Sequence, residues 1–226
     1  MPIQMIGLRV NHFKASVLAL VCGLSSPYVM AGMIDKEGMA AWEICAMCHS
    51  LNGISRMAKF PKLAGQKPAY IIKQFRDFNA GRRTNDGGQM EAITTEVDID
   101  AIEAIANYFA QLPPPPAAKL ESDSESSQLF NDGEEIFYQG VGRTQACANC
   151  HAQSDSLEKQ QIAANAPWLF GQHKNYLVKQ LKDFKSANRA NDVTVSMHQI
   201  ARNLSPQAID AVTFFLAHKQ PGKGSE

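Results

Sequence analysis

The chain has 226 residues, and its 22 Lys and Arg are balanced by 22 Asp and Glu, so its formal net charge is zero. This length is enough for one large domain or two small ones. A neutral balance gives no basic footprint and argues against nucleic acid as a partner. Four of the five cysteines fall in two short motifs, which excludes a framework of structural disulfides.

The amino terminus has the pattern of an export signal. Arg9 and Lys14 precede an apolar run at 15–21, and small residues before Gly32 offer a cleavage site. Glycine, serine and proline interrupt the run, which falls short of the roughly 20 apolar residues that a membrane span needs. We therefore predict a cleaved signal peptide at 1–31 and a periplasmic location, rather than a retained anchor.

Three helices are predicted in residues 32–112, from apolar residues at helical spacing. The first covers residues 35–48, with Asp35 as its N-cap. The second covers residues 68–79 and has proline in its first turn, where proline is tolerated. The third follows Asp98, which is a good N-cap residue.

The first helix carries a Cys-x-x-Cys-His pentapeptide, and the same pentapeptide recurs in the second half of the chain. The six residues are Cys45, Cys48, His49, Cys147, Cys150 and His151. This pattern is typical of c-type haem attachment: two thiols one helical turn apart can bond one porphyrin, and the histidine can bind its iron. The alternatives are a redox-active cysteine pair with a chance histidine, or half of a zinc site. The duplication argues against both, so we expect two covalent haem c groups.

The duplication extends well beyond the pentapeptides. Pro61 recurs as Pro167, Tyr70 as Tyr176 and Asp86 as Asp192, each 106 positions later. Two copies of so long a repeat indicate two homologous domains rather than a solenoid, which needs at least about three shorter repeats.

A linker separates the two copies. Four consecutive prolines and then an acidic serine-rich run occupy residues 113–127, and we interpret them as an extended spacer followed by solvated coil. The predicted domains are therefore 32–112 and 128–226. The second domain repeats the middle helix at residues 175–186 and the last helix after the cap residue Ser205.

Met90 and Met197 are the predicted axial ligands on the face of each iron opposite the histidine. Methionine is more often a core filler than a ligand. These two, however, are the only methionines at matching positions of the repeat. The pattern agrees with the His/Met ligation of cytochromes c. His198 is a rival ligand, but its counterpart in the first half is a glutamate.

Pro61 and Pro167 each open a Pro-x-Leu-x-Gly turn. A histidine that binds a metal usually donates its other ring N–H to a carbonyl, and proline keeps its carbonyl. We expect these carbonyls to accept from His49 and His151, although shaping the turn is an alternative and compatible role. The unmatched His173 is expected to be a surface or satisfied structural residue, as is the unmatched His218.

Taken together, these motifs resemble those of the cytochrome c4 family. Each half has Cys-x-x-Cys-His, Pro-x-Leu-x-Gly-Gln, Tyr-x-x-x-Gln and a methionine before a short capped helix, and the resemblance covers most of residues 33–218. It implies an all-α fold of two tandem class I cytochrome c domains, each wrapped around one covalent haem. The insertion of Gly140-Val141-Gly142 before the second pentapeptide departs from a simple repeat.

The resemblance also implies a function. It implies a periplasmic electron carrier between a membrane quinol-oxidising complex (quinol–cytochrome c reductase) and a terminal cytochrome c oxidase or reductase, and it leaves peripheral membrane association open. The alternative is the two-haem subunit of a dehydrogenase such as flavocytochrome c sulfide dehydrogenase. A catalytic haem enzyme such as a peroxidase is disfavoured, because matched methionines leave no open position at iron.

Overall fold

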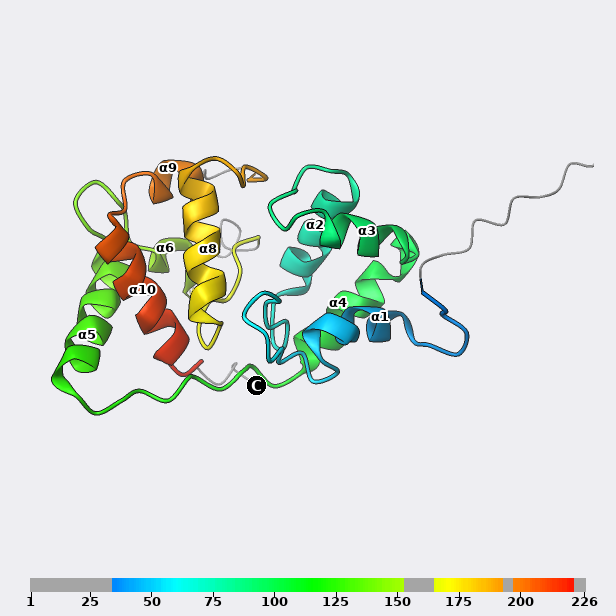
Figure 1. The fold of residues 1–226 in the computed structure, drawn as a ribbon, viewed down its shortest axis with the longest axis horizontal. Coiled ribbons are helices and arrows are strands. Elements are labelled where there is room, and N and C mark those ends of the chain that lie inside the picture. Colours follow the sequence, from blue (N-terminus) through cyan, green and yellow to red (C-terminus); the bar gives the residue numbers. More distant parts are fainter. Residues whose placement is uncertain (1–33, 153–164, 193–196, 222–226) are drawn as a thin grey trace, which may run out of the picture. The chain divides into compact units, whose positions relative to one another are not determined.

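The structure is a computed structural model, and it describes residues 34–152, 165–192 and 197–221. The predicted signal peptide at 1–31 lies outside the described residues. The described part belongs to one compact unit, Met33–Glu226. Within it the chain is helical, and its only extended pairing is an isolated bridge between Val141 and Thr144 (Figure 1). Among these residues no helix combines the length and the apolar character that crossing a bilayer requires.

The helices of the first half pack around one apolar core. They are α1 (Ala41–His49), α2 (Pro68–Asn79), α3 (Gln89–Thr95), a 3-10 turn (Ile99–Ala101) and α4 (Ile102–Gln111). Phe75 from α2 packs with Ile44 from α1 and with Ile105 and Phe109 from α4. The core therefore fixes α1, which carries the first pentapeptide, against α2 and α4.

The predicted start of the first helix was wrong. The Asp35 carboxylate accepts from the Glu37 N–H at 3.1 Å and closes a local turn. Gly38 follows with φ +75°, which a helix cannot accommodate. The helix begins at Ala41 instead, where the Glu43 side chain accepts from the Ala40 N–H at 2.8 Å. The second helix of the first half was predicted at the observed bounds, and Asp98 caps the 3-10 turn as expected.

The second half has five described helices. They are α5 (Ser124–Gln139), α6 (Ala148–His151), α8 (Lys174–Lys185), α9 (Met197–Ala201) and α10 (Pro206–His218). Ser205 caps α10, as predicted, by accepting from the Ala208 N–H at 3.1 Å. Phe137 and Phe215 are fully buried and pack with Phe130 and Phe170.

The acidic serine run is not coil over its whole length. Helix α5 begins at Ser124, inside the predicted linker 113–127, because the Asp123 carboxylate accepts from the Ser126 N–H at 2.8 Å. Serine and acidic residues favour the first turn of a helix as well as coil. The helix is held against α10 at Gly133, where an added Cβ would lie 2.1 Å from the Ala211 carbonyl oxygen.

Candidate haem-binding sites

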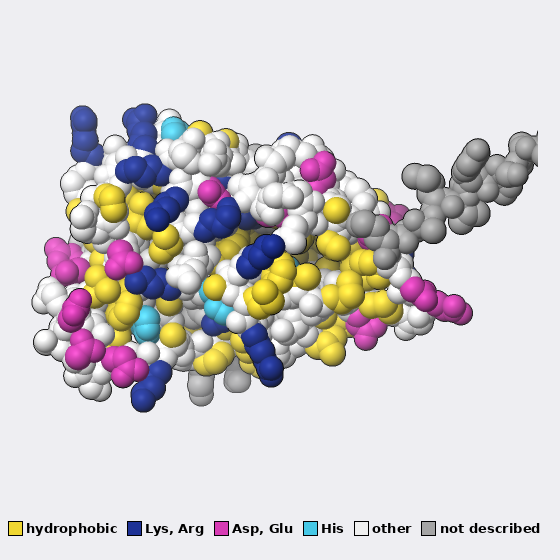
Figure 2. Space-filling model, in the orientation of Figure 1, with side chains coloured by type: hydrophobic (Ala, Val, Ile, Leu, Met, Phe, Trp, Pro, Cys, Tyr) yellow, Lys and Arg dark blue, Asp and Glu magenta, His cyan; other side chains and the backbone are white. Residues whose placement is uncertain are grey.

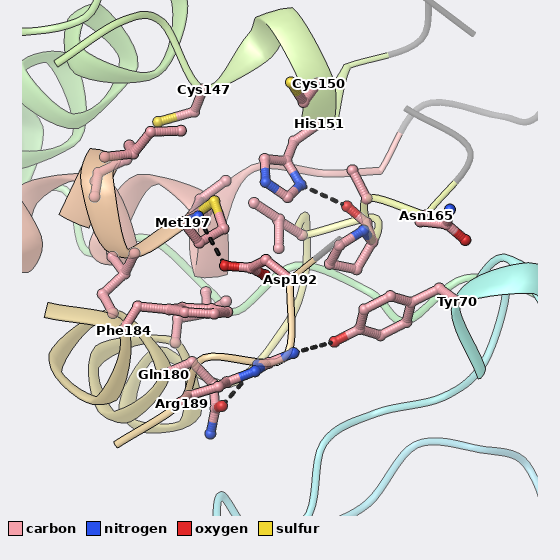
Figure 3. A pocket seen from close by; sticks show the side chains of 18 of the residues that line it. Tyr70, Cys147, Cys150, His151, Asn165, Gln180, Phe184, Arg189, Asp192 and Met197 are labelled. Atoms are coloured by element: carbon pink, nitrogen blue, oxygen red, sulfur yellow. Dashed lines mark hydrogen bonds between the residues drawn. The ribbon is translucent and has the colours of Figure 1, made fainter. Parts of the chain in front are cut away.

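One pocket in the second half brings together every residue that the sequence assigns to the second haem. Cys147, Cys150, His151, Pro167 and Met197 all line it (Figure 3). The pocket holds about 1210 Å³ of empty space, counting the part open to solvent. Much of the remaining wall is apolar, with side chains from α8 and α10 such as Leu177, Phe184 and Leu216. Apolar walls with two thiols, an imidazole and a thioether fit an apolar macrocycle that carries an iron.

The cysteine chemistry argues against one of the two alternatives, a redox-active pair. The four pentapeptide cysteines form no disulfide. Burial raises the pKa of both Cys45 and Cys147 to about 11. A redox-active pair needs a lowered thiol pKa, so these are poorly suited to disulfide exchange. In the described part of the chain, no group of three or more His, Cys, Asp or Glu side chains is placed to hold a metal ion.

Both histidines are oriented as the sequence predicts. The Nδ1–H of His49 donates to the Pro61 carbonyl at 2.7 Å, and that of His151 donates to the Pro167 carbonyl at 2.9 Å. The hydrogen bonds expected of the two prolines are thus present. In each ring they leave Nε2 available as a ligand. Burial lowers the pKa of His151 to about 4 although the Pro167 carbonyl favours the charged form, so the ring is neutral, as a metal ligand must be.

Each methionine lies in the first turn of a short helix, and an aspartate accepts a hydrogen bond from its backbone N–H. The Asp86 carboxylate accepts from the Met90 N–H at 2.6 Å, and the Asp192 carboxylate accepts from the Met197 N–H at 2.8 Å. The sequence shows these aspartates at matching positions of the repeat, but it did not lead us to predict this contact. Their constant place in the repeat, shortly before the methionine, was the available signal.

The other histidines have structural partners. The rival ligand His198 lies with its Nδ1 2.7 Å from the Phe184 carbonyl oxygen, and it is not part of the pocket wall. The Nε2 of His173 is 2.8 Å from the Ser55 carbonyl oxygen. His218 bonds the carbonyl of the preceding helical turn at 2.7 Å. The expectation of satisfied structural histidines is confirmed.

The first half of the chain also lines the pocket assigned to the second haem. Tyr70, Lys73 and Gln74, all from α2, are among its lining residues. In Figure 3 the Tyr70 hydroxyl accepts a hydrogen bond from Arg189, at 3.3 Å. Sequence reasoning noticed the Tyr-x-x-x-Gln motif but did not foresee that its residues reach the other haem site.

These residues belong to a reciprocal polar interface between the halves. Arg83 donates to Gln180 at 3.0 Å, and its counterpart Arg189 donates to Gln74 at 3.1 Å. Three more hydrogen bonds across the interface each recur between the matching residues of the repeat. Asn85 donates to Asp183, as Asn191 donates to Asp77, and Arg83 donates to Tyr176, as Arg189 donates to Tyr70. The backbone N–H of Lys62 donates to Gln172, as that of Trp168 donates to Gln66. Every partner is replaced by the residue 106 positions away, so the interface has a two-fold pattern.

The comparisons with known proteins agree with this geometry. A cytochrome c4 of Pseudomonas aeruginosa is 34% identical over 209 residues, which are 91% of this chain and 98% of that protein. The chain belongs to the cytochrome c4 family. A second cytochrome c4, of Thiocapsa roseopersicina, is 36% identical over 175 residues, which are 76% of this chain and 85% of that protein. No family model matches the chain.

Solved structures show the same two-domain fold. The crystal structure of reduced recombinant cytochrome c4 from Pseudomonas stutzeri aligns with a TM-score of 0.64 at 30% identity, over 81% of this chain and 98% of that chain. The all-α fold of two cytochrome c domains is thereby confirmed. As a cytochrome c4, the chain is a two-haem c-type cytochrome that carries electrons and is not itself an enzyme.

A second group of relatives is named for one reaction. A thiosulfate dehydrogenase electron acceptor of Stutzerimonas stutzeri is 29% identical over 209 residues, which are 90% of this chain and 93% of that protein. A thiosulfate dehydrogenase from Marichromatium purpuratum aligns over 78% of this chain with a TM-score of 0.64 and 26% identity, but the match covers only 36% of that longer chain.

Proposed function

We propose that this cytochrome c4 is exported by a cleaved signal peptide and carries electrons in the periplasm, from a membrane quinol-oxidising complex to a terminal oxidase or reductase. Thioether bonds to Cys45 and Cys48 hold the first haem, and bonds to Cys147 and Cys150 hold the second. When bound, each haem supplies a one-electron redox centre. The chain supplies its attachment, its axial ligands and a dry pocket.

The observation that carries the proposal is the pocket assigned to the second haem. His151 and Met197 line the same cavity, and the Nδ1 of His151 is engaged by a carbonyl, which leaves Nε2 for the metal. His49 and Met90 have the matching positions in the repeat, so each haem would take one histidine and one methionine as iron ligands. An iron held by both ligands would have no place for substrate, which suits electron transfer. His/Met ligation also raises the reduction potential.

Replacing the methionines tests this ligand assignment. Met197→Ala opens a position at the second iron, so that haem should lose its methionine–iron charge-transfer band, bind carbon monoxide and fall in potential, because the soft thioether favours ferrous iron. Met90→Ala should do the same at the first haem. Met57→Ala is the control, since Met57 is exposed and has no counterpart in the repeat. A full charge-transfer band in Met90→Ala and Met197→Ala would show that other residues are the ligands.

The second candidate is the cytochrome subunit or dedicated acceptor of a dehydrogenase. The similarity to thiosulfate dehydrogenase electron acceptors supports it. Native purification distinguishes the two candidates. A free carrier elutes alone with two haems that survive acid–acetone extraction. A subunit co-purifies in constant ratio with a dehydrogenase, and sulfur substrates then reduce its haems.

A further inference from the structure

We propose that each half of the chain tunes the haem of the other half through one glutamine. Gln66 acts on His151 and Gln172 acts on His49, in each case through the peptide group that follows a proline. These glutamines end the two Pro-x-Leu-x-Gly-Gln motifs. The inference rests on the proposed ligation of iron by the two histidines, and it adds two positioning residues and a link between the haem sites.

The peptide group between Pro167 and Trp168 is hydrogen-bonded at both ends. Its carbonyl oxygen, from Pro167, accepts from the His151 Nδ1–H at 2.9 Å. Its N–H, from Trp168, donates to the Gln66 Oε1 at 2.9 Å. A peptide group is planar and conjugated, so an acceptor on its N–H polarises its carbonyl and makes that carbonyl a stronger acceptor. We call this chain of two hydrogen bonds through one peptide group the proline relay.

The same relay recurs in the first half with the halves exchanged. The Pro61 carbonyl accepts from the His49 Nδ1–H at 2.7 Å, and the Lys62 N–H of the same peptide group donates to the Gln172 Oε1 at 2.9 Å. A stronger bond at Nδ1 raises the basicity of the ring as a ligand, and a more basic ligand favours ferric over ferrous iron. Each glutamine therefore lowers the reduction potential of the haem in the other half.

Hydrogen bonds hold each glutamine side chain in one orientation. The Gln66 Nε2 donates to the Trp168 carbonyl at 3.0 Å, and the Gln66 Oε1 also accepts from the Lys67 N–H at 3.1 Å. Two backbone N–H groups point at this atom, so it must be the oxygen of the amide. The Gln172 Nε2 donates to the Lys62 carbonyl at 3.0 Å in the same way. The acceptor of each relay is thus fixed in place before the haem titrates.

Water is a poor substitute for either glutamine. Both are buried, each with 7% of its surface exposed. Figure 2 shows side chains filling the space between the ribbons of the two halves on the face drawn. The residue after each proline also places its side chain on the other half. The Trp168 ring centroid lies 3.8 Å from the Lys67 ammonium, and the Lys62 ammonium donates to the Gly171 carbonyl at 2.6 Å.

Replacing each glutamine by leucine tests the relay, because leucine has a similar volume and no acceptor. The ratio of ferrous to ferric iron at a fixed solution potential is measured for each haem, by NMR of the haem-loaded protein during stepwise oxidation. In Gln66→Leu this ratio should rise about threefold at the second haem, which is about 30 mV for one electron, and stay within about 1.5-fold at the first. Gln172→Leu should give the reverse pattern. In the ferrous protein, the ring N–H of the affected histidine should exchange faster with solvent.

Two further variants separate the relay from loss of packing. Gln66→Glu keeps an acceptor for the Trp168 N–H, and a carboxylate is a stronger acceptor than an amide, so the ratio at the second haem should fall instead of rise. Asn85→Ala is the control for the interface itself. It removes hydrogen bonds to Gln180 and Asp183, which lie outside both proline motifs. Both ratios should then stay within about 1.5-fold of wild type.

The crossed pattern decides the outcome. A rise at the opposite haem in both leucine variants, with a fall in Gln66→Glu, supports the relay. Equal changes at both haems, or a rise in Gln66→Glu, would overturn it. Where a leucine variant does not fold, Gln66→Glu and Gln172→Glu decide, since equal ratios to wild type at the opposite haem would also overturn it. The methionine variants test the ligands separately, so loss of their charge-transfer bands without a crossed pattern refutes the relay alone.

Discussion

Replacing Gln180 by leucine should show how much the polar interface stabilises the protein. One oxygen of the Gln180 side chain accepts three hydrogen bonds: from Arg189 at 2.8 Å, Arg83 at 3.0 Å and Asn85 at 3.1 Å. Gln180, Arg83 and Arg189 are all buried. Leucine keeps the approximate volume of the side chain and removes the acceptor, so these donors lose a partner that water cannot readily replace.

The expected cost follows from the kind of donor that is lost. A hydrogen bond from a charged group contributes about 1.5–3 kcal/mol, and one from a neutral amide about 1 kcal/mol. Each guanidinium keeps other acceptors, since Arg83 still reaches Gln74 and Tyr176 and Arg189 still reaches Tyr70. The lower end applies to both, and with the bond from the Asn85 amide the loss in the free energy of unfolding is about 4 kcal/mol. For a chain of this size, that corresponds to a fall of about 12 °C in Tm.

The assay is thermal and denaturant unfolding of the haem-loaded protein, followed by circular dichroism. Gln74→Leu should cost nearly as much as Gln180→Leu, because its oxygen accepts from Arg83, Arg189 and Asn191 in the same pattern. The double variant should cost less than the sum, since both residues share the two arginines. Gln128→Leu, on the exposed face of α5, is the control. A loss below about 0.5 kcal/mol for Gln180→Leu, or a strong inequality between the two glutamines, would refute the reciprocal interface.

Four further substitutions test other contacts. Asp192→Ala frees the backbone amide of the ligand helix, so the methionine–iron charge-transfer band of the second haem should weaken, and Asp86→Ala should do the same at the first; optical spectra check both. Burial opposes ionisation of Asp77, but hydrogen bonds from basic and amide side chains outweigh it and lower its pKa. The stability that Asp77→Asn removes should therefore be present at neutral pH and vanish as the pH falls below about 4, which denaturant melts at several pH values measure. Gly133→Ala drives a methyl group into a carbonyl of α10 and should cost about 2 kcal/mol, against no loss for the exposed Ser127→Ala on the same helix, by thermal unfolding.

Local chemistry explains which parts of the structure the sequence predicts. The pentapeptides and the cap residues Asp98 and Ser205 act within a few positions along the chain, so their patterns suffice. The carbonyl bonds of Pro61 and Pro167 span only 12 and 16 positions, and the repeat fixes them. The methionine helices were missed because α9 spans only five residues and α3 seven, too few for a periodic signal.

The interface was missed for a different reason. Its hydrogen bonds join residues about 100 positions apart, and polar side chains at helical spacing usually indicate a solvated face. Gln74 and Gln180 have that pattern, yet both accept hydrogen bonds across the interface, where Gln180 is buried and Gln74 is half-buried. The only available signal was the recurrence of Gln, Arg and Asn at the same repeat positions. The start of α5 was missed because Asp123 and its serines suit a cap and a coil equally well.

The reciprocal interface is the type of contact that a symmetric dimer makes, but here both sides belong to one chain. In a dimer every substitution appears twice, so a change that suits one copy is imposed on the other. In the fused chain a substitution appears once. The interface residues stay matched because each contact and its repeat, such as Arg83 with Gln180 and Arg189 with Gln74, need the same two residue types. Positions outside the interface, such as Met47 and its counterpart Asn149, are free to differ. Fusion thus allows two haem domains of common origin to diverge on the faces that they do not share.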